Sequence, residues 1–503
     1  MNGLMQHWIS TNAPSRNHSG GMGSARALAC LGRRPRRPHS CAQQSDRLVI
    51  LFQHGSDRRG AGRNTRRRVC SPFLNAYFRL GAIGIARAVA GLVLGASLRL
   101  GAGDFQGSTH SVAYDGDIIN YHLRTPNEAV ARLQKKIDGG EARLSFDRQF
   151  GYLPALLESL GVPRSSQMLV FSKTSLQRQL ISPANPRAIY FNDDVYIGFI
   201  PGAPLLEVSA VDPNLGGVFY ALAQDATAKP QFKRSADCLQ CHGAAKTLGV
   251  PGHLVRSIGT DETGELDLHN EVSNITHRTP FEERWAGWYV TGTHGNQVHR
   301  GNLVGQEAFN RQAKEPNYLG NLTDLSPLFD VRKYPFAGSD IAALMVLEHQ
   351  AHMHNYFTRL NFETQIMLRQ YGHIRYLKSQ SEALLRYLLF TEEAPLAAAV
   401  RGNQAFVSAF TRSGPRDSKG RSLRDLDLQT RLFKHPCSFL IYSPAFDSLP
   451  APMKEHLYQR LWDILTGQDQ NPDFSKLRQE DRSAILDILL ETKSGLPAYW
   501  KKS

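Results

Sequence analysis

The sequence predicts an α+β fold, in which a mixed N-terminal part with short strands leads into a loop-rich segment and then a mainly helical C-terminal domain. Three observations predict this order. Short apolar runs such as Ala188–Phe191 and Val195–Ile200 are separated by turn residues. Residues 225–335 are rich in Gly, Asn, His and Thr, which is typical of loops. From Ser339 onward, apolar residues recur with helical spacing.

The N-terminal part of the body is expected to begin with two helices. Asn127–Ile137 has an amphipathic pattern, and Leu153–Leu160 has Pro154 in its first turn and Gly161 just past its end. Five strands are then predicted, at 168–172, 188–191, 195–200, 205–211 and 217–222.

A hairpin turn is expected between the second and third of these strands. Asn192, Asp193 and Asp194 separate the two apolar runs there. Carboxylates at such a place can ligate a metal ion, but Asn and Asp are also the ordinary residues of tight turns. The turn is the favoured interpretation.

The C-terminal part is expected to be a set of helices. Ser339 is the predicted N-cap of a long helix that runs from Ile341 towards Leu377. Further helices are predicted at 381–389, 395–400, 452–465 and 481–490. Thr411–Ser422 is polar and contains Gly and Pro, so it is predicted to be an exposed loop.

The charge of the chain is concentrated at one end. The 503 residues carry a net charge of +14, and the first hundred hold 16 Arg, no Lys and only two acidic residues. The other 403 residues hold 43 basic and 43 acidic side chains, and so they are neutral overall. A nucleic-acid-binding body needs a basic surface, so this class is not expected.

The first hundred residues have the composition of a leader. Residues 1–80 are predicted to be a disordered Arg-rich leader, or sequence upstream of the true start codon. Residues 81–103 are predicted to be a signal peptide or a membrane anchor, with a core helix as the plain alternative, since Ala88–Leu98 is an uninterrupted apolar run. A periplasmic or exported location follows. The body then divides into segments 104–224, 225–335 and 336–503.

One pentapeptide indicates which cofactor the chain binds. Only three of the six cysteines lie in the body, and two of them form Cys238-Leu239-Gln240-Cys241-His242. This C-x-x-C-H pattern is the signature of covalent haem c attachment, and chance would produce it roughly 0.003 times in such a chain. Three other interpretations of the motif are less favoured. A zinc site needs four ligands, and Cys437 is the one other cysteine of the body. A thioredoxin-like site needs a βαβ setting, and a disulfide across two intervening residues is strained.

The spacing has a physical reason. Two thiols must reach the two vinyl groups of one porphyrin, and the next imidazole must reach the iron, which one helical turn achieves. His242 is therefore the expected proximal ligand, beside the covalent haem at Cys238 and Cys241. The second nitrogen of its ring is expected to donate to a backbone carbonyl.

Several longer segments of the sequence resemble segments of a known protein family. They are Met168–Gln177, Tyr190–Phe199, His277–Gly295, Leu347–Gln350 with Met353–Asn355, and Arg431–Phe446. With the C-x-x-C-H motif, they make residues from about 167 to 500 resemble a family of large, poorly characterised bacterial cytochrome-c-like proteins. The resemblance implies one haem c for each chain and no particular substrate.

A low-spin electron-transfer haem also needs a sixth ligand. His349 is the first candidate and Met353 the second, because they lie one turn apart on one face of the long predicted helix. Any one of these residues is more often structural than ligating. Lesser candidates are Met168, His253, His294 and His299.

Two arginines are candidate contacts of the haem propionates, because a guanidinium offers a planar fork to a carboxylate. They are Arg278 and Arg284, for which salt bridging with Glu282 or Glu283 is the alternative. The sequence thus predicts an exported monohaem cytochrome that transfers single electrons to a redox partner protein or a small-molecule donor or acceptor. The alternatives are a haem enzyme, peroxidase-like or a substrate oxidoreductase, with an open distal site, and a haem-sensing or structural module.

Overall fold

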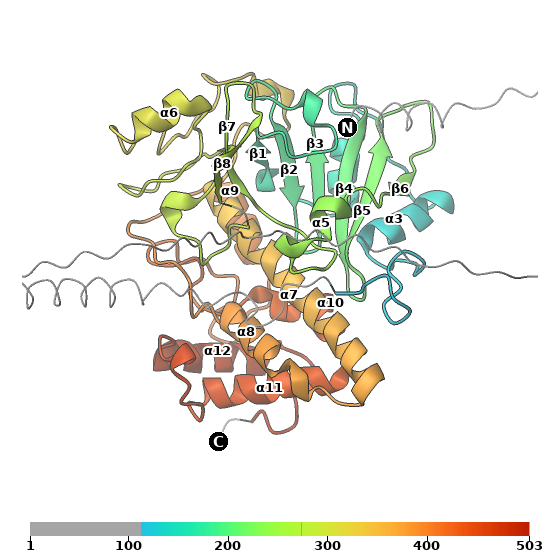
Figure 1. Cartoon of the computed structure of the whole chain (residues 1–503), viewed down its shortest axis with the longest axis vertical. Helices are drawn as coiled ribbons and strands as arrows, with labels where there is room; N and C mark the ends of the chain where they lie inside the picture. The colour runs from blue at the N-terminus through green and yellow to red at the C-terminus, as the bar shows by residue number, and fades with distance from the viewer. Residues whose placement is uncertain (1–111, 273, 502–503) are drawn as a thin grey trace, which may run out of the picture. The chain divides into compact units, whose positions relative to one another are not determined.

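A computed structural model describes residues 112–272 and 274–501 (Figure 1). The leader, signal or anchor predicted at 1–80 and 81–103 lies outside these residues. All described residues belong to one compact unit. None of the helices at 112–272 and 274–501 is long and apolar enough to cross a membrane.

The centre of the unit is a seven-stranded antiparallel sheet with the order β6-β5-β4-β3-β2-β1-β9. Its strands are β1 (Met168–Val170), β2 (Arg187–Phe191), β3 (Val195–Phe199), β4 (Leu205–Asp212), β5 (Gly216–Ala223), β6 (Phe232–Arg234) and β9 (Trp288–Tyr289). A smaller sheet pairs β7 (Ser257–Thr260) with β8 (Leu266–Val272). The mixed α+β class and the five predicted strands are confirmed, whereas β6 to β9 were not predicted.

The predicted hairpin turn joins β2 to β3. The Asn192 side-chain oxygen accepts from the backbone N–H of Asp194 at 3.2 Å and of Val195 at 2.9 Å. The Asn192 N–H donates to the Val195 carbonyl at 3.1 Å. These hydrogen bonds within the turn therefore explain why an asparagine stands at position 192.

The two faces of the sheet have different partners. Tyr190, Ile197 and Val208 lie side by side on one face, in a core shared with α3 (Ala129–Asp138) and α4 (Leu153–Ser159). The opposite face faces α7 (Ile341–Tyr371), and its rows mix aromatic with polar residues. Both early helices lie where the sequence predicts them, and α4 is followed by Gly161 at φ 63°.

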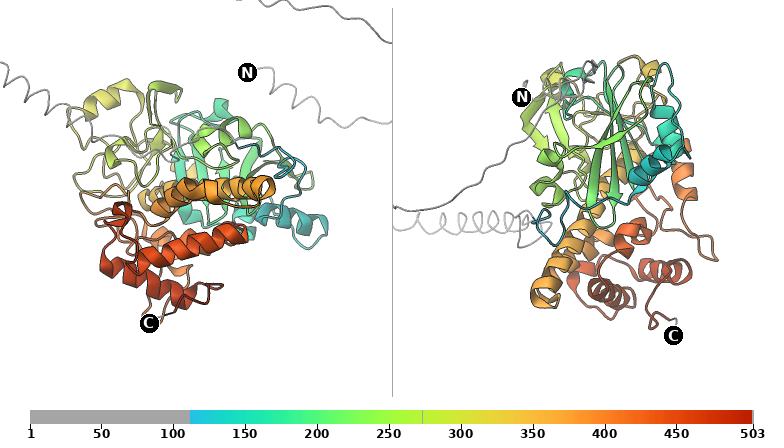
Figure 2. Two further views of the ribbon diagram at one scale, coloured as in Figure 1. Left: turned by 60° about the horizontal axis from the view of Figure 1, so that its bottom comes forward. Right: turned by 90° about the vertical axis from the view of Figure 1, so that its right-hand side faces the viewer.

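Helix α7 is buried between the sheet and the C-terminal helices over most of its length (Figures 1 and 2). Its N-cap is Asp340, whose Oδ1 accepts from the Ala343 N–H at 2.8 Å, so the predicted Ser339 cap is off by one residue. Ser339 instead bonds to the sheet, because its hydroxyl donates to the Tyr289 carbonyl at 2.6 Å. The helix ends at Tyr371, before Gly372 in the left-handed conformation, rather than near Leu377.

Further helices are α6 (Gly305–Gln312), α8 (Lys378–Leu388), α9 (Gln404–Arg412), α10 (Pro444–Asp447), α11 (Ala451–Leu465) and α12 (Gln479–Thr492). The helix predicted at 395–400 is wrong. Backbone N–H groups there donate to residues far along the chain, from Leu396 to the Thr430 carbonyl at 3.0 Å and from Val400 to the Leu428 carbonyl at 2.7 Å. These bonds replace the bonds within a helix.

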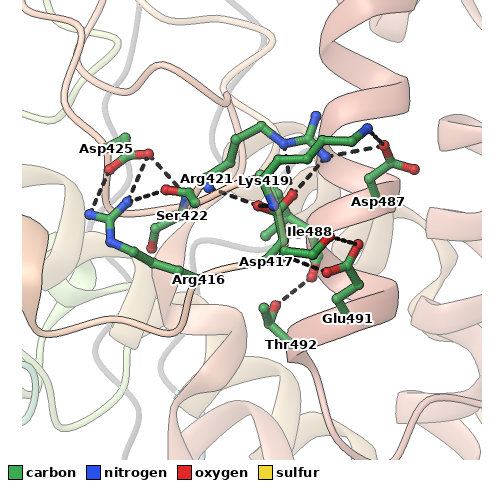
Figure 3. A network of polar contacts seen from close by, with 12 residues as sticks. Arg416, Asp417, Lys419, Arg421, Ser422, Asp425, Asp487, Ile488, Glu491 and Thr492 are labelled. Carbon is green, nitrogen blue, oxygen red and sulfur yellow. Dashed lines mark hydrogen bonds and ion pairs between the residues drawn. The ribbon is translucent and has the colours of Figure 1, made fainter.

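The polar segment after α9 is a loop, as predicted, but ion pairs hold it in place (Figure 3). Arg421 bonds to Asp417 at 2.7 Å and to Asp487 of α12 at 3.1 Å, while Arg416 pairs with Asp425 at 2.9 Å. Asp417 is buried within this network. The loop is therefore fixed against α12 just before it reaches residue 424.

Candidate functional site

The C-x-x-C-H motif forms the one-turn helix α5 (Leu239–His242), which follows the edge strand β6. Cys238 is its N-cap, and the His242 N–H donates to the Cys238 carbonyl at 2.9 Å. Both thiols are free, with Cys238 half-buried and Cys241 exposed. A single turn at the surface therefore carries both thiols and the imidazole, as the spacing predicts.

The His242 ring is held by one backbone carbonyl. Its Nδ1 lies 2.9 Å from the Gly252 oxygen, and the Gly252 N–H donates back to the His242 carbonyl at 2.8 Å. Since a carbonyl only accepts, Nδ1 carries the proton and Nε2 keeps its lone pair. Within residues 112–272 and 274–501, Nε2 has no hydrogen-bond partner. This is the tautomer that a metal-binding histidine needs.

Two rings pack beneath His242. Its ring centroid lies 4.8 Å from that of Phe219 and 6.2 Å from that of His253. His253 is itself fixed, because its Nε2 bonds to the Ser209 hydroxyl at 2.8 Å and its ring stacks on Tyr196 at 4.1 Å. Desolvation lowers the pKa of His242 and of His253, so both rings are neutral at pH 7.

Helix α7 closes the back of the site. The Asn355 side chain accepts from the His253 N–H at 3.0 Å and donates to the His253 carbonyl at 2.7 Å. The Asn355 amide lies so close to Gly252 that a Cβ atom at residue 252 would overlap the amide oxygen. The segment that orients His242 is thus clamped between the motif and α7.

We expect Gly252→Ala to lower the free energy of unfolding by about 1–3 kcal/mol, because the added methyl group overpacks the contact with Asn355. Urea denaturation measures the change. Gly139→Ala is the matched control, since Gly139 has an ordinary helical φ of −74° and a Cβ there meets no atom closer than 3.4 Å. Equal stability of the two variants would contradict the clamp.

A charged pair lies on the sheet face beside the motif. Arg187 bonds to Glu207 at 2.9 Å, and both contribute to the electrostatic environment of His242. Arg187 Nε is buried and has no hydrogen-bond partner among residues 112–272 and 274–501. Burial raises the pKa of the Cys238 thiol to about 11, and the Glu207 carboxylate adds to this rise, so the thiol is protonated at pH 7.

The predicted sixth ligands lie in the core. His349 Nδ1 lies 2.9 Å from His277 Nδ1, and His349 Nε2 lies 2.8 Å from the Ser438 hydroxyl. Its ring packs on Tyr387 and Phe390. Both ring nitrogens are thus engaged within the protein. Met353 is fully buried in the main apolar core, and no described contact joins either residue to α5.

The lesser candidates separate into two groups. His253 is the histidine that the structure brings beside His242. Met168 is a buried residue of β1, and His294 and His299 form a pair with ring centroids 4.6 Å apart in another part of the core. Burial lowers the pKa of His299 to about 3, so this ring is neutral.

The two predicted propionate arginines are paired with protein carboxylates. Arg284 is buried, ion-pairs with Glu348 and donates to the Thr279 carbonyl. Arg278 bonds to Glu392 at 2.7 Å. Arg187, which was not predicted, is an arginine close enough to His242 to lower the pKa of its ring.

The described residues contain no group of three or more His, Cys, Asp or Glu side chains that would hold a bare metal ion. Comparison of the chain with family models, curated proteins and solved structures finds no match. The case for function therefore rests on the motif and its surroundings.

Sequence reasoning missed most of the supporting residues. Glu207 and Ser209 alternate with apolar residues along β4, and this period of two signals a polar sheet face. Gly252 has no comparable signal, because its role depends on a helix about a hundred residues further along the chain.

Proposed function

We propose that the chain binds one haem c covalently through Cys238 and Cys241, with His242 as the proximal iron ligand, and serves in one-electron transfer. The observation that carries this proposal is the hydrogen bond between His242 Nδ1 and the Gly252 carbonyl, 2.9 Å long. It leaves Nε2 as the ligating atom on the same helical turn as two free thiols.

The donor set fits the group. A c-type haem requires two thiols for its thioether bonds and one neutral imidazole, and the turn offers all three at the surface. When bound, the haem supplies a one-electron iron couple. The chain holds the imidazole orientation through Gly252, and packs Phe219 and His253 against the same ring.

Arg187 is the proposed propionate contact, in place of Arg278 and Arg284. Among the described residues, its buried Nε has no hydrogen-bond partner, and its guanidinium forms an ion pair with Glu207 close to His242. A guanidinium there would balance the negative charge of a propionate. His349 and Met353 are not part of the proposal, because their side chains are built into the core.

The test is production of the full chain in a host that matures c-type cytochromes. We expect one covalently bound haem per chain and a potentiometric titration that fits a single one-electron step. His242→Ala should change the iron spectrum while the haem stays attached, and His456→Ala, a partly buried histidine of α11, should not. Colourless wild-type protein would refute the proposal.

A further inference from the structure

A second site lies at the β2–β3 turn, outside the C-x-x-C-H motif. There the turn, α7, α9 and the loop after α9 enclose a cleft of about 440 Å³. This volume is typical of pockets that bind small organic molecules. Its polar lining includes Asp193, Asp194, Gln350 and Arg424.

The cleft has more acceptors than donors. Arg424 forms an ion pair with Asp193, which takes up the single guanidinium of the lining. The Asp194 carboxylate has no hydrogen-bond donor among residues 112–272 and 274–501. Burial raises the pKa of Asp194, although His354, Arg132 and Arg424 oppose the rise, so the ionised form gains from a further positive charge.

A buried amide adds another acceptor. Gln350 is fully buried in α7, and its Nε2 donates to the Asn192 carbonyl at 2.8 Å and to the Tyr196 hydroxyl at 2.8 Å. The Asn192 carbonyl only accepts, which fixes the amide orientation. Within the part of the chain that the structure describes, Gln350 Oε1 is left without a partner, and unsatisfied buried acceptors are rare in folded proteins.

The other walls are aromatic. Phe191, Phe406 and Phe410 line the cleft, with ring centroids 5.9 Å apart for the first pair and 5.8 Å for the second. Such rings pack against an apolar body, and their faces also attract cations.

We propose that this cleft binds a small organic cation, with one ammonium or amidinium group held by Asp194 and Gln350 and an apolar body packed among the three phenylalanines. The Gln350 oxygen is a buried acceptor without a partner among the described residues, the Asp194 carboxylate lines the same cleft, and Asp193 already has its counter-ion in Arg424. An ammonium or amidinium group carries several N–H donors, enough for both acceptors.

The site is rigid. His354 Nε2 lies 2.8 Å from the Asp193 carbonyl, and fixes the turn to α7. Arg424 lies over the Phe410 and Phe439 rings, 4.9 and 4.3 Å from their centroids. The ion-pair network before it, drawn in Figure 3, holds the loop that delivers this arginine. The cleft therefore does not need to be ordered by its ligand, which favours binding.

The test is calorimetric titration of the full chain with three probes of one shape, namely 2-phenylethylammonium, 2-phenylethanol and phenylacetate. We expect saturable 1:1 binding of the cation, with at least about tenfold higher affinity than for the other two. No saturable binding of the cation, or equal affinity for the alcohol, would overturn the proposal. Preference for phenylacetate would assign the cleft to anions at Arg424 and would also overturn it.

A variant locates the binding. Asp194→Asn keeps the shape of the side chain and removes its charge, so the preference for the cation should fall by about tenfold while the protein stays folded by circular dichroism. Asp324→Asn, at an exposed aspartate outside the cleft, is the matched control and should bind like the wild type. Unchanged binding by Asp194→Asn would overturn the assignment. Neither result depends on bound haem, so the two proposals fail separately.

Discussion

Replacing both Cys238 and Cys241 by serine will abolish covalent haem in protein made by a host that matures c-type cytochromes. Serine keeps the volume of each side chain but has no thiol to form a thioether. Each single variant retains one thiol and should retain at most one covalent bond. Acid–acetone extraction followed by a haem stain after denaturing electrophoresis measures the attached fraction, which is expected to fall to background in the double variant.

The third cysteine of the described residues provides the control. Cys437 is fully buried, and its thiol pKa is raised by burial, so it is not available for attachment. Cys437→Ala should therefore keep the full amount of covalent haem. Haem that survives extraction from the double serine variant would show that the motif is not the attachment site.

The fold could be predicted where local pattern decides the structure. Strands β2 and β3 and the turn at Asn192 follow from alternating apolar residues and turn chemistry, which act within a few residues. The segment 395–400 was predicted wrongly because its hydrogen bonds go to residues 428–430. Strand β9 escaped notice for a similar reason, since two residues pair with β1 more than a hundred positions earlier.

The residues of the candidate site also fall into two groups, those that the local sequence predicts and those that depend on distant contacts. Cys238, Cys241 and His242 are contiguous, so one helical turn assembles them and the sequence is sufficient to identify them. The clamp at Gly252 depends on Asn355, and this contact exists only after α7 has packed. The expected role of His349 came from helical spacing. Because α7 is buried on all sides along this stretch, spacing alone could not tell which neighbour His349 meets.

Arg284 is important for stability because it pairs with Glu348, a buried residue of α7. Its guanidinium ion-pairs with Glu348 and donates to the Thr279 and His277 carbonyls, and its side chain is only 2% exposed. We expect Arg284→Leu to lower the free energy of unfolding by about 3–5 kcal/mol, because a buried carboxylate and two carbonyls lose their partner. Arg311→Leu, in an exposed pair with Glu315, should change it by no more than about 0.5 kcal/mol. Urea denaturation gives both values.

The pH dependence of this loss distinguishes a lost ion pair from a simple packing defect. Burial raises the pKa of Glu348 to about 7, and Arg284 opposes the rise, so removing the arginine raises this pKa further. The folded state then holds a proton that the unfolded state releases near pH 4.3, so stability falls as the pH rises above that value. The deficit of Arg284→Leu should therefore be larger at pH 8 than at pH 5. Adding Glu348→Gln should make this difference smaller, because the amide has no charge to bury and still offers an oxygen to Trp285 Nε1, which now donates to Glu348 at 3.2 Å. Part of the difference should remain, because burial also raises the pKa of Glu393 to about 7 and Arg284 opposes that rise as well. A deficit that is equal at both pH values would show that packing, and not the buried charge, makes Arg284 necessary.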